Sequence, residues 1–548
     1  MNSPSEIFKS YEKIREFKAS LGTRGIYDQA EINERFFIGD QWNGVTTDSN
    51  RPLVRNNIIK RIGEMKLSNI NNPVTVNFSA DGVPETIEMK ERVRKIKNSM
   101  PDTISGIEQT EEINLIMSAM SNYFEVTSER LNFDKVRERA LIDAYISGTG
   151  IIYTYWDNNV NTGLYLDQNR TRPILGDIAV ETLDVENVYF GDGSLEDIQA
   201  QPFIIIAQKL SLEKIKKEAK ENGINIEPKA DESNEQKATV LTKMFKETID
   251  GITTVKAVRV IKEGVIRPLF DMQISLYPLA KYTFLRRKNC PYGESEITHL
   301  IPNQIAINRM ITASSWATMI SGMPIMVVNN DVVRERITND PGQIIRVSGN
   351  VDEVASAIRY VSPPSFSANF DNASLALSSM TLNMAGANDA ALGDIVPDNH
   401  SAIIAVREAA LMPMQPLKNA YFRFCEEVAR IWAEFWIQKY GNRSLKINDE
   451  NGTWYMPFDA DRYKNLLINA RVDVGASTTT GEAQSITTLD NLLDRQIITT
   501  LQYLKRLPAG TIPDVTGLIR ELEAKSISIS DELSQEEQLE IDELEEII

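Results

Sequence analysis

The abrupt change of residue pattern at Gly148-Thr149-Gly150 limits what this chain can fold into more than any other feature. Before these residues, apolar side chains recur at helical spacing and predict helices over residues 4–38, 107–130 and 133–147. After them, the aromatic and β-branched run 151–156 begins a region of short strands. This order predicts an α+β fold, with helices and sheets built from separate segments.

The C-terminal half of the chain alternates in the same way. Helical spacing over 303–320, 369–384 and 401–438 predicts three helices, and a β-rich stretch over 323–362 separates the first two. Residues 482–524 are again helical in pattern. The third helix carries the broad apolar stripe of a buried helix, formed by Tyr421, Phe424, Cys425, Val428, Ile431, Trp432, Phe435 and Trp436.

The formal net charge of -18 restricts how this chain can treat nucleic acid. A surface that wraps DNA needs clustered Lys and Arg to neutralise phosphates, and the excess of carboxylates argues against such a surface. A wall past which DNA slides needs few cations, so the charge leaves a DNA-conducting role open. The acidic segment from Asp531 to Glu546 is expected to repel DNA or to stay disordered.

Membrane association is not expected from this sequence. No apolar run approaches the roughly 18 residues that cross a bilayer. The N-terminal residues lack a basic region followed by an apolar one, so we expect no secretory signal.

Residues that carry catalysis or bind metal ions are scarce. The two histidines, His299 and His400, have no metal-ligand spacing, and Cys290 and Cys425 are far apart in the sequence. No Gly-x-x-x-x-Gly-Lys-Ser/Thr loop is present, so ATP hydrolysis by a Walker mechanism is not expected. The sequence therefore predicts no catalytic residue, no metal site and no cofactor.

Five short motifs follow one another between about residues 30 and 440, and none of them is specific by itself. In order, the first to fifth motifs are Phe37 to Trp42 with Arg51 to Ile59; Asp143 to Gly150; Asp184 to Ser194; Cys290 to Ser295 with Pro302 to Asn308; and Pro341 to Ile345 with Ser362 to Pro364. Their order and spacing resemble the portal proteins of tailed bacteriophages, especially those of short-tailed phages.

The resemblance implies a portal fold, mainly helical with a β-rich wing and clip. In that fold about twelve copies close into a ring around an axial channel. The resemblance implies that residues 1–210 form the N-terminal part of the wing and that 211–237 hold the candidate first stem helix and a linker. Residues 238–294 would form the clip, and 295–320 the second stem helix. Residues 321–481 would return to the wing, with a tunnel loop near 346–368, and 482–548 would form the crown and the acidic tail.

The resemblance also implies a function without catalysis. The dodecameric ring would sit at one capsid vertex of the virion, after assembly in the host cytoplasm, and double-stranded DNA would pass through it during genome packaging and ejection. The implied partners are the major capsid protein, the terminase large subunit, tail or connector proteins and a scaffolding protein. A different ring-forming connector or capsid-associated structural protein is the alternative.

Two sets of residues are candidates for these roles. Gln304, Asn308, Ser348 and Asn350 are expected to face the channel, although Gln304 and Asn308, one turn apart, could equally form the polar face of an ordinary helix. Arg286, Arg287 and Lys288 are expected to dock the motor or tail, with a solvated loop as the other interpretation.

Overall fold

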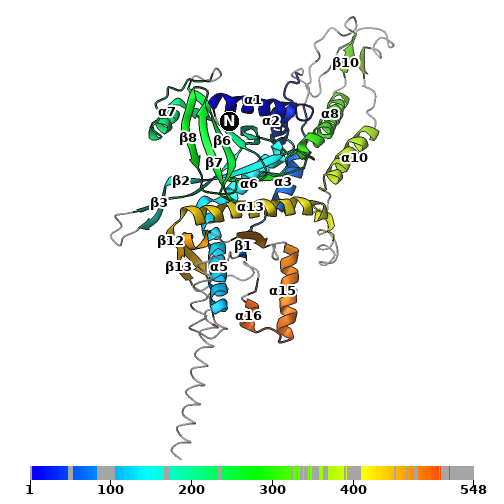
Figure 1. Ribbon diagram of the computed structural model, residues 1–548. Helices are drawn as coiled ribbons and strands as arrows, with labels where there is room; N and C mark the ends of the chain where they lie inside the picture. Colours follow the sequence, from blue (N-terminus) through cyan, green and yellow to red (C-terminus); the bar gives the residue numbers. More distant parts are fainter. Residues whose placement is uncertain are drawn as a thin grey trace, which may run out of the picture.

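The computed structural model describes residues 3–46, 53–82, 105–165, 173–231, 236–322, 325–329, 357–361, 368–387, 409–449, 452–464, 467–473 and 479–504, with single residues or pairs between 331 and 522. Within them the chain combines helices with antiparallel sheets, so the α+β class is confirmed. A packed body carries a projecting arm at one corner, and the helices nearest the C-terminus lie on the other side of the body (Figure 1).

The single helix expected over residues 4–38 is in fact two helices, α1 (Pro4–Ser20) and α2 (Gly25–Ile38). The break lies at Gly25, whose φ angle of 77° is one that residues with a side chain rarely adopt. A Cβ atom on Gly25 would also lie 2.5 Å from the carbonyl oxygen of Ala19, so only glycine fits here. Apolar spacing alone does not reveal such a break.

The next elements bring distant parts of the chain together. Helix α3 (Ile58–Ile70) buries an apolar face that includes Ile58, Ile59, Ile62 and Met65, and strand β1 (Thr75–Gly82) follows. Strand β1 pairs with β14 (Leu467–Asp473), which comes from the other end of the sequence, and helix α5 (Ser105–Leu131) packs on β1. The N- and C-terminal parts of the chain therefore share one core.

The switch from helix to strand occurs where the residue pattern changes. Helix α6 (Phe133–Ser147) ends at Gly148, and strand β2 (Thr149–Tyr165) begins directly after it. A Cβ atom on Gly150 would lie 1.8 Å from the Ala140 carbonyl oxygen, so the strand packs against α6 only with glycine there. Strand β2 forms the centre of a three-stranded sheet with β3 (Pro173–Leu183) and β9 (Leu279–Thr283).

A five-stranded antiparallel sheet makes up the other side of the body. Its strands follow chain order: β4 (Val188–Phe190), β5 (Ile204–Ser211), β6 (Lys237–Ile249), β7 (Ile252–Ile261) and β8 (Gly264–Asp271), with the 3-10 turn η1 (Val185–Asn187) before them. Strands from the segment expected to be the clip (238–294) thus share this sheet with strands from the segment expected to be wing. The two segments form one packed unit.

Helices cover both faces of this sheet. Helix α7 (Leu212–Glu221) packs on one face through Ile215 and Ala219, in a cluster that contains Val240. Helix α1 packs on the other face in a cluster that contains Leu241, since neighbouring strand residues point to opposite faces. The stem that sequence analysis assembled from 211–237 and 295–320 therefore does not form in that way, because α7 belongs to the sheet.

The arm consists of two long helices and a small sheet (Figure 1). Helices α8 (Glu296–Gly322) and α10 (Ala368–Met384) pack against each other, and strands β10 (Ile325–Val328) and β11 (Ile358–Val361) pair at the far end. Helix α8 begins at Glu296, earlier than expected, so Pro302 lies inside it and not in its first turn.

Helix α13 (Gln415–Lys439) crosses the body and buries the whole predicted aromatic stripe. Trp432 and Trp436 are among its fully buried side chains. The remaining described elements are the turn η2 (Met412–Met414), the hairpin β12 (Asn442–Asp449) and β13 (Gly452–Asp459), and helices α14 (Ala460–Tyr463), α15 (Thr479–Asp494) and α16 (Thr500–Leu504).

Candidate functional site

The root of the arm contains a buried cluster of three amide side chains. Gln304 and Asn308 project from successive turns of α8 and are 1% and 2% exposed. Gln304 Nε2 donates to Asn308 Oδ1 at 3.0 Å, and Asn308 Nδ2 donates to Gln41 Oε1 at 2.6 Å. We call Gln41, Gln304 and Asn308 the amide cluster.

The amide cluster holds the backbone that leads into α3. Gln304 Oε1 accepts from the N–H groups of Ile58 at 3.0 Å and Ile59 at 3.3 Å, which have no acceptor within their own helix. Gln304 Nε2 donates to the Asn56 carbonyl oxygen at 2.6 Å, and Asn308 Oδ1 accepts from the Asn56 N–H at 3.1 Å. The first and fourth motifs therefore meet at the root of the arm.

The expectation that Gln304 and Asn308 face a channel is wrong. These side chains bond to partners inside the subunit, and side chains buried this deeply do not reach a channel wall. Two amides one turn apart fit either a polar helix face or a shared internal partner, and the sequence does not distinguish these cases. Ser348 and Asn350, the other two channel candidates, lie outside the described residues.

The second motif meets the fourth at a contact between two glycines. A Cβ atom on Gly293 would lie 2.3 Å from the Gly148 carbonyl oxygen. The Gly293 N–H donates to Thr149 Oγ1 at 2.8 Å, and Ser295 Oγ donates to the Tyr145 carbonyl oxygen at 2.5 Å. The segment that leads into α8 is thus fixed at the junction of α6 and β2.

The third motif reaches the same junction through a tyrosine. The Tyr292 hydroxyl accepts from the Phe190 N–H at 3.2 Å and donates to the Val188 carbonyl oxygen at 3.3 Å. Four of the five motifs therefore surround the start of α8, where the helical and the β-rich parts of the body join. The fifth motif lies mostly outside the described residues.

A buried lysine that sequence analysis did not single out lies at this junction. Lys18 of α1 is fully buried, and its ammonium group donates to the carbonyl oxygens of Val185 at 2.6 Å, Glu186 at 2.9 Å and Val188 at 3.3 Å. Burial lowers the pKa of Lys18 to about 7, while the carboxylates of Asp184 and Glu186 oppose that shift. The only signal in the sequence is that Lys18 continues the apolar spacing of Ile7, Tyr11 and Ile14.

The two helices of the arm carry few charges beyond the first half of α8, whereas strand β11 at the far end carries the exposed Arg359. Helix α8 has no charged residue after Arg309, and α10 has only Asp371. Ser314 Oγ donates to Asp371 Oδ1 at 2.6 Å, and Asn303 Nδ2 donates to Thr381 Oγ1 at 3.2 Å, which fixes the helices antiparallel. Large apolar side chains exposed on the arm include Met319 (45%), Val327 (51%), Leu375 (68%), Met380 (60%) and Met384 (78%).

The three basic docking candidates lie on the turn between β9 and α8. Arg286 is bound to Glu196 through two bonds, Nε to Oε2 at 2.6 Å and the second nitrogen to Oε1 at 3.0 Å. Arg287 Nε donates to Glu294 Oε2 at 3.2 Å. Lys288 is exposed and has no ion pair among the described residues. The turn therefore presents one cation without a carboxylate partner.

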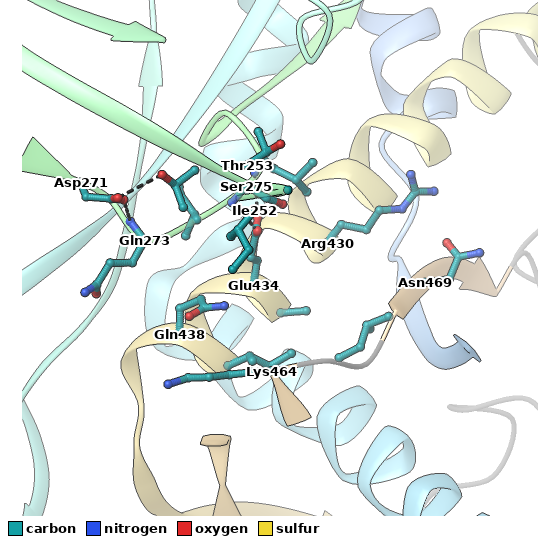
Figure 2. A pocket seen from close by; sticks show the side chains of 17 residues that line it. Ile252, Thr253, Asp271, Gln273, Ser275, Arg430, Glu434, Gln438, Lys464 and Asn469 are labelled. Atoms are coloured by element: carbon teal, nitrogen blue, oxygen red, sulfur yellow. Dashed lines mark hydrogen bonds between the residues drawn. The ribbon is translucent and has the colours of Figure 1, made fainter. Parts of the chain in front are cut away.

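A cleft of about 840 Å³ opens between the β6–β7 turn, the β8–β9 connection, α13 and β14 (Figure 2). Figure 2 shows Glu434 pointing from α13 towards Ser275. Its Oε1 accepts a hydrogen bond from the Ser275 N–H at 2.5 Å, and its Oε2 accepts one from the Leu276 N–H at 3.0 Å. Asp271 accepts from Gln273 N–H at 2.7 Å. Both carboxylates in this cleft therefore hold turns in place and are not arranged as a catalytic pair.

Two further observations bear on chemistry. Within the described part of the chain, no three His, Cys, Asp or Glu side chains come together as a metal site requires. Among the described helices, none is both long and apolar enough to cross a lipid bilayer.

Comparison with protein families gives one match. The model of the phage P22-like portal protein family matches residues 260–535, about half of this chain. The match includes α8, α10 and α13, and hence the arm and the residues Gln304 and Asn308 at its root. No curated protein matches the chain.

Proposed function

The chain belongs to the phage P22-like portal protein family, and from this premise we propose that about twelve copies close into a ring around an axial channel at one capsid vertex. Double-stranded DNA passes through the channel when the genome is packaged and when it is ejected. The proposed partners are the major capsid protein, the terminase large subunit, tail or connector proteins and a scaffolding protein. The ring acts by its geometry, as expected of a structural protein without catalysis.

The scarcity of charge on the helix pair of the arm is the observation that supports this function best. A channel past which phosphates slide must not bind them, and α10 and the outer half of α8, from Ile311 to Gly322, contain no Lys or Arg. Helix surfaces exposed to water normally carry charges of both signs. An uncharged helix pair with exposed methionines is instead typical of a surface that neighbouring copies cover.

We propose that α8 and α10 form the stem and that residues 323–367, which they carry, form the clip. The antiparallel packing of these helices and their projection from the body support this assignment (Figure 1). Residues 346–368, expected to be the tunnel loop, fall largely outside the described residues and within the segment that the arm carries. The crown then begins with α15, and the turn with Arg286, Arg287 and Lys288 remains a proposed docking surface on the body.

Cryo-electron microscopy of the purified chain, alone and co-expressed with a scaffolding protein, tests this function. The expected result is a ring of about twelve subunits, with α8 and α10 around a central hole wide enough for duplex DNA. A compact dimer without a hole would contradict the proposal, and so would a ring whose arms point away from the axis. A connector without a genome gate would form rings that are absent from the packaging vertex of assembled particles.

A further inference from the structure

A cleft of about 1160 Å³ lies between α1, the turn after β4 and the turn that precedes α8. One face of α1 forms its long wall, through Ser10, Lys13, Ile14, Phe17 and Leu21. At 1.5 Å per residue this wall is about 16 Å long. The opposite wall belongs to the same turn that carries Arg287 and Lys288.

The floor and walls of this cleft are aromatic and aliphatic. Phe17 is 36% exposed, and its ring covers Gly193, where an added Cβ atom would lie 2.7 Å away. Phe203 lines the cleft as well, and Ile14 and Phe190 are buried at its base. A soluble protein keeps contiguous apolar surface of this kind mainly where another molecule covers it.

The rim of the cleft carries cations without partners. Lys13 and Lys288 are exposed and have no ion pair among the described residues. Arg287 uses Nε for Glu294, and a terminal nitrogen of its guanidinium would lie 3.3 Å from a Cβ atom placed on Gly22. The guanidinium therefore extends towards the α1 side of the cleft.

Both carboxylates of the cleft already have partners. Glu294 holds Arg287, and Asp192 accepts from the N–H of Ser194 at 2.8 Å and from its hydroxyl at 2.7 Å. The hydrogen bonds from Ser194 lower the pKa of Asp192, so this carboxylate stays ionised. The cleft thus combines apolar walls with a small excess of positive charge, in a chain whose net charge is -18.

We propose that this cleft binds an acidic peptide segment of a partner protein. A large apolar side chain of the peptide packs against Phe17 and Phe203, and its carboxylates pair with Lys13 and Lys288. A peptide fits better than duplex DNA, because a peptide offers a large apolar side chain to Phe17 and Phe203, whereas the outer surface of a DNA duplex consists mainly of phosphates. The inference rests on the proposed docking role of the turn that carries Arg287 and Lys288. It differs in one contact residue: Lys13 takes part in docking, and Arg286 does not, because Arg286 is bound to Glu196.

A binding experiment on the full chain tests the inference. The probe is the fluorescently labelled peptide Asp-Glu-Leu-Phe-Glu-Asp-Leu-Glu, and its affinity is measured by fluorescence anisotropy. The matched control peptide, Asn-Gln-Leu-Phe-Gln-Asn-Leu-Gln, should bind about tenfold more weakly or worse, because it lacks the carboxylates. Equal binding of the two peptides, no binding of either, or tighter binding of a labelled oligonucleotide would overturn the proposal.

Variants of the chain locate the binding site. Lys13→Glu with Lys288→Glu should weaken binding of the acidic peptide about tenfold or more, and Phe17→Ala should weaken it with the charges intact. Lys214→Glu with Lys229→Glu makes the same charge change at exposed lysines outside the cleft and should leave the affinity unchanged. If both charge reversals weaken binding equally, the cleft is not the site.

Electron microscopy of the same proteins separates this inference from the proposed function. Rings that form in the wild type while the peptide fails to bind would overturn only the cleft. Peptide binding by a chain that forms no ring under any condition would overturn the portal function and leave the cleft intact. Unchanged melting temperatures of the variants show that lost binding does not reflect lost folding.

Discussion

The side-chain nitrogen of Gln304 lies 3.0 Å from the side-chain oxygen of Asn308, and both residues hold a segment that lies about 250 positions earlier in the chain. The two amides thus tie α8, which continues into the arm, to the start of α3 in the body. Apolar contacts alone allow helices to slide or rotate, whereas buried hydrogen bonds fix one register. The direction in which the arm leaves the body depends on these bonds.

Replacing Gln304 with Met should destabilise the protein strongly. Methionine fills a similar volume but offers no acceptor to the Ile59 N–H, leaves the Ile58 N–H only the Asn56 carbonyl oxygen and removes the donor to that oxygen, which should lower the free energy of unfolding by about 2–4 kcal/mol. Urea unfolding followed by circular dichroism measures the change. Asn303→Ala, which removes one partly buried bond on the same helix, should cost only about 1 kcal/mol; similar losses in the two variants would argue against a special role of the amide cluster.

Gly150→Ala should prevent normal folding. Its Cβ atom would lie 1.8 Å from the Ala140 carbonyl oxygen, so α6 and β2 must separate, at a cost of about 4 kcal/mol or more. Gly223→Ala is the control, because nothing lies within 4 Å of its Cβ position and only its φ angle of 73° is unfavourable. That variant should lose about 1 kcal/mol. Soluble expression and thermal unfolding compare the two, and a well-folded Gly150→Ala protein would show that α6 and β2 have room to separate.

Asp143→Asn should stabilise the protein above pH 6 and not below pH 4. Burial and then the Asp184 carboxylate raise the pKa of Asp143 to about 6 in the folded state, against an ordinary value of 3.8. The folded state therefore binds a proton more readily than the unfolded state, and ionisation of Asp143 costs stability as the pH rises from 3.8 through 6. Asparagine resembles the protonated form and avoids that cost.

The expected gain at pH 8 is about 1–2 kcal/mol, less than the full shift would give, because solvent screens a half-buried group. Thermal unfolding of wild type and variant between pH 4 and pH 8 measures it. Glu138→Gln, at an exposed carboxylate of the same helix, should change the melting temperature little at any pH. A constant difference between wild type and Asp143→Asn at all pH values would rule out titration of Asp143 as the cause.

Met380→Glu should reduce ring formation without unfolding the chain. Met380 is 60% exposed on α10, so a carboxylate is tolerated in the isolated subunit but not where a neighbouring arm covers it. Size-exclusion chromatography with light scattering should show mostly unassembled chain at an unchanged melting temperature. Leu269→Glu changes an exposed apolar residue of the body in the same way and should leave rings intact. Normal rings from Met380→Glu would mean that this face of the arm is not a subunit contact.

Local pattern predicted most elements but not how they combine. The helices α5, α6 and α10 and the strand after Gly150 lie close to their predicted positions, because helical and strand periodicity are properties of neighbouring residues. Helix α13 ends where expected but begins at Gln415, well inside the predicted range 401–438. The break at Gly25 and the early start of α8 were missed, since each depends on contacts that periodicity does not contain. A helix was expected within residues 211–237, and α7 lies there, yet it packs on a sheet and not on α8.

The sequence by itself determined the order of helical and β-rich segments, the excess of negative charge and the five motifs that indicated the family. Only the tertiary structure decided what the polar residues of those motifs do. Gln304 and Asn308 have the spacing of a water-facing pair, but the segment that carries Asn56 covers them and bonds to them. Burial depends on which distant segments pack together, and no pattern within α8 records that Asn56 and Gln41 lie beside it.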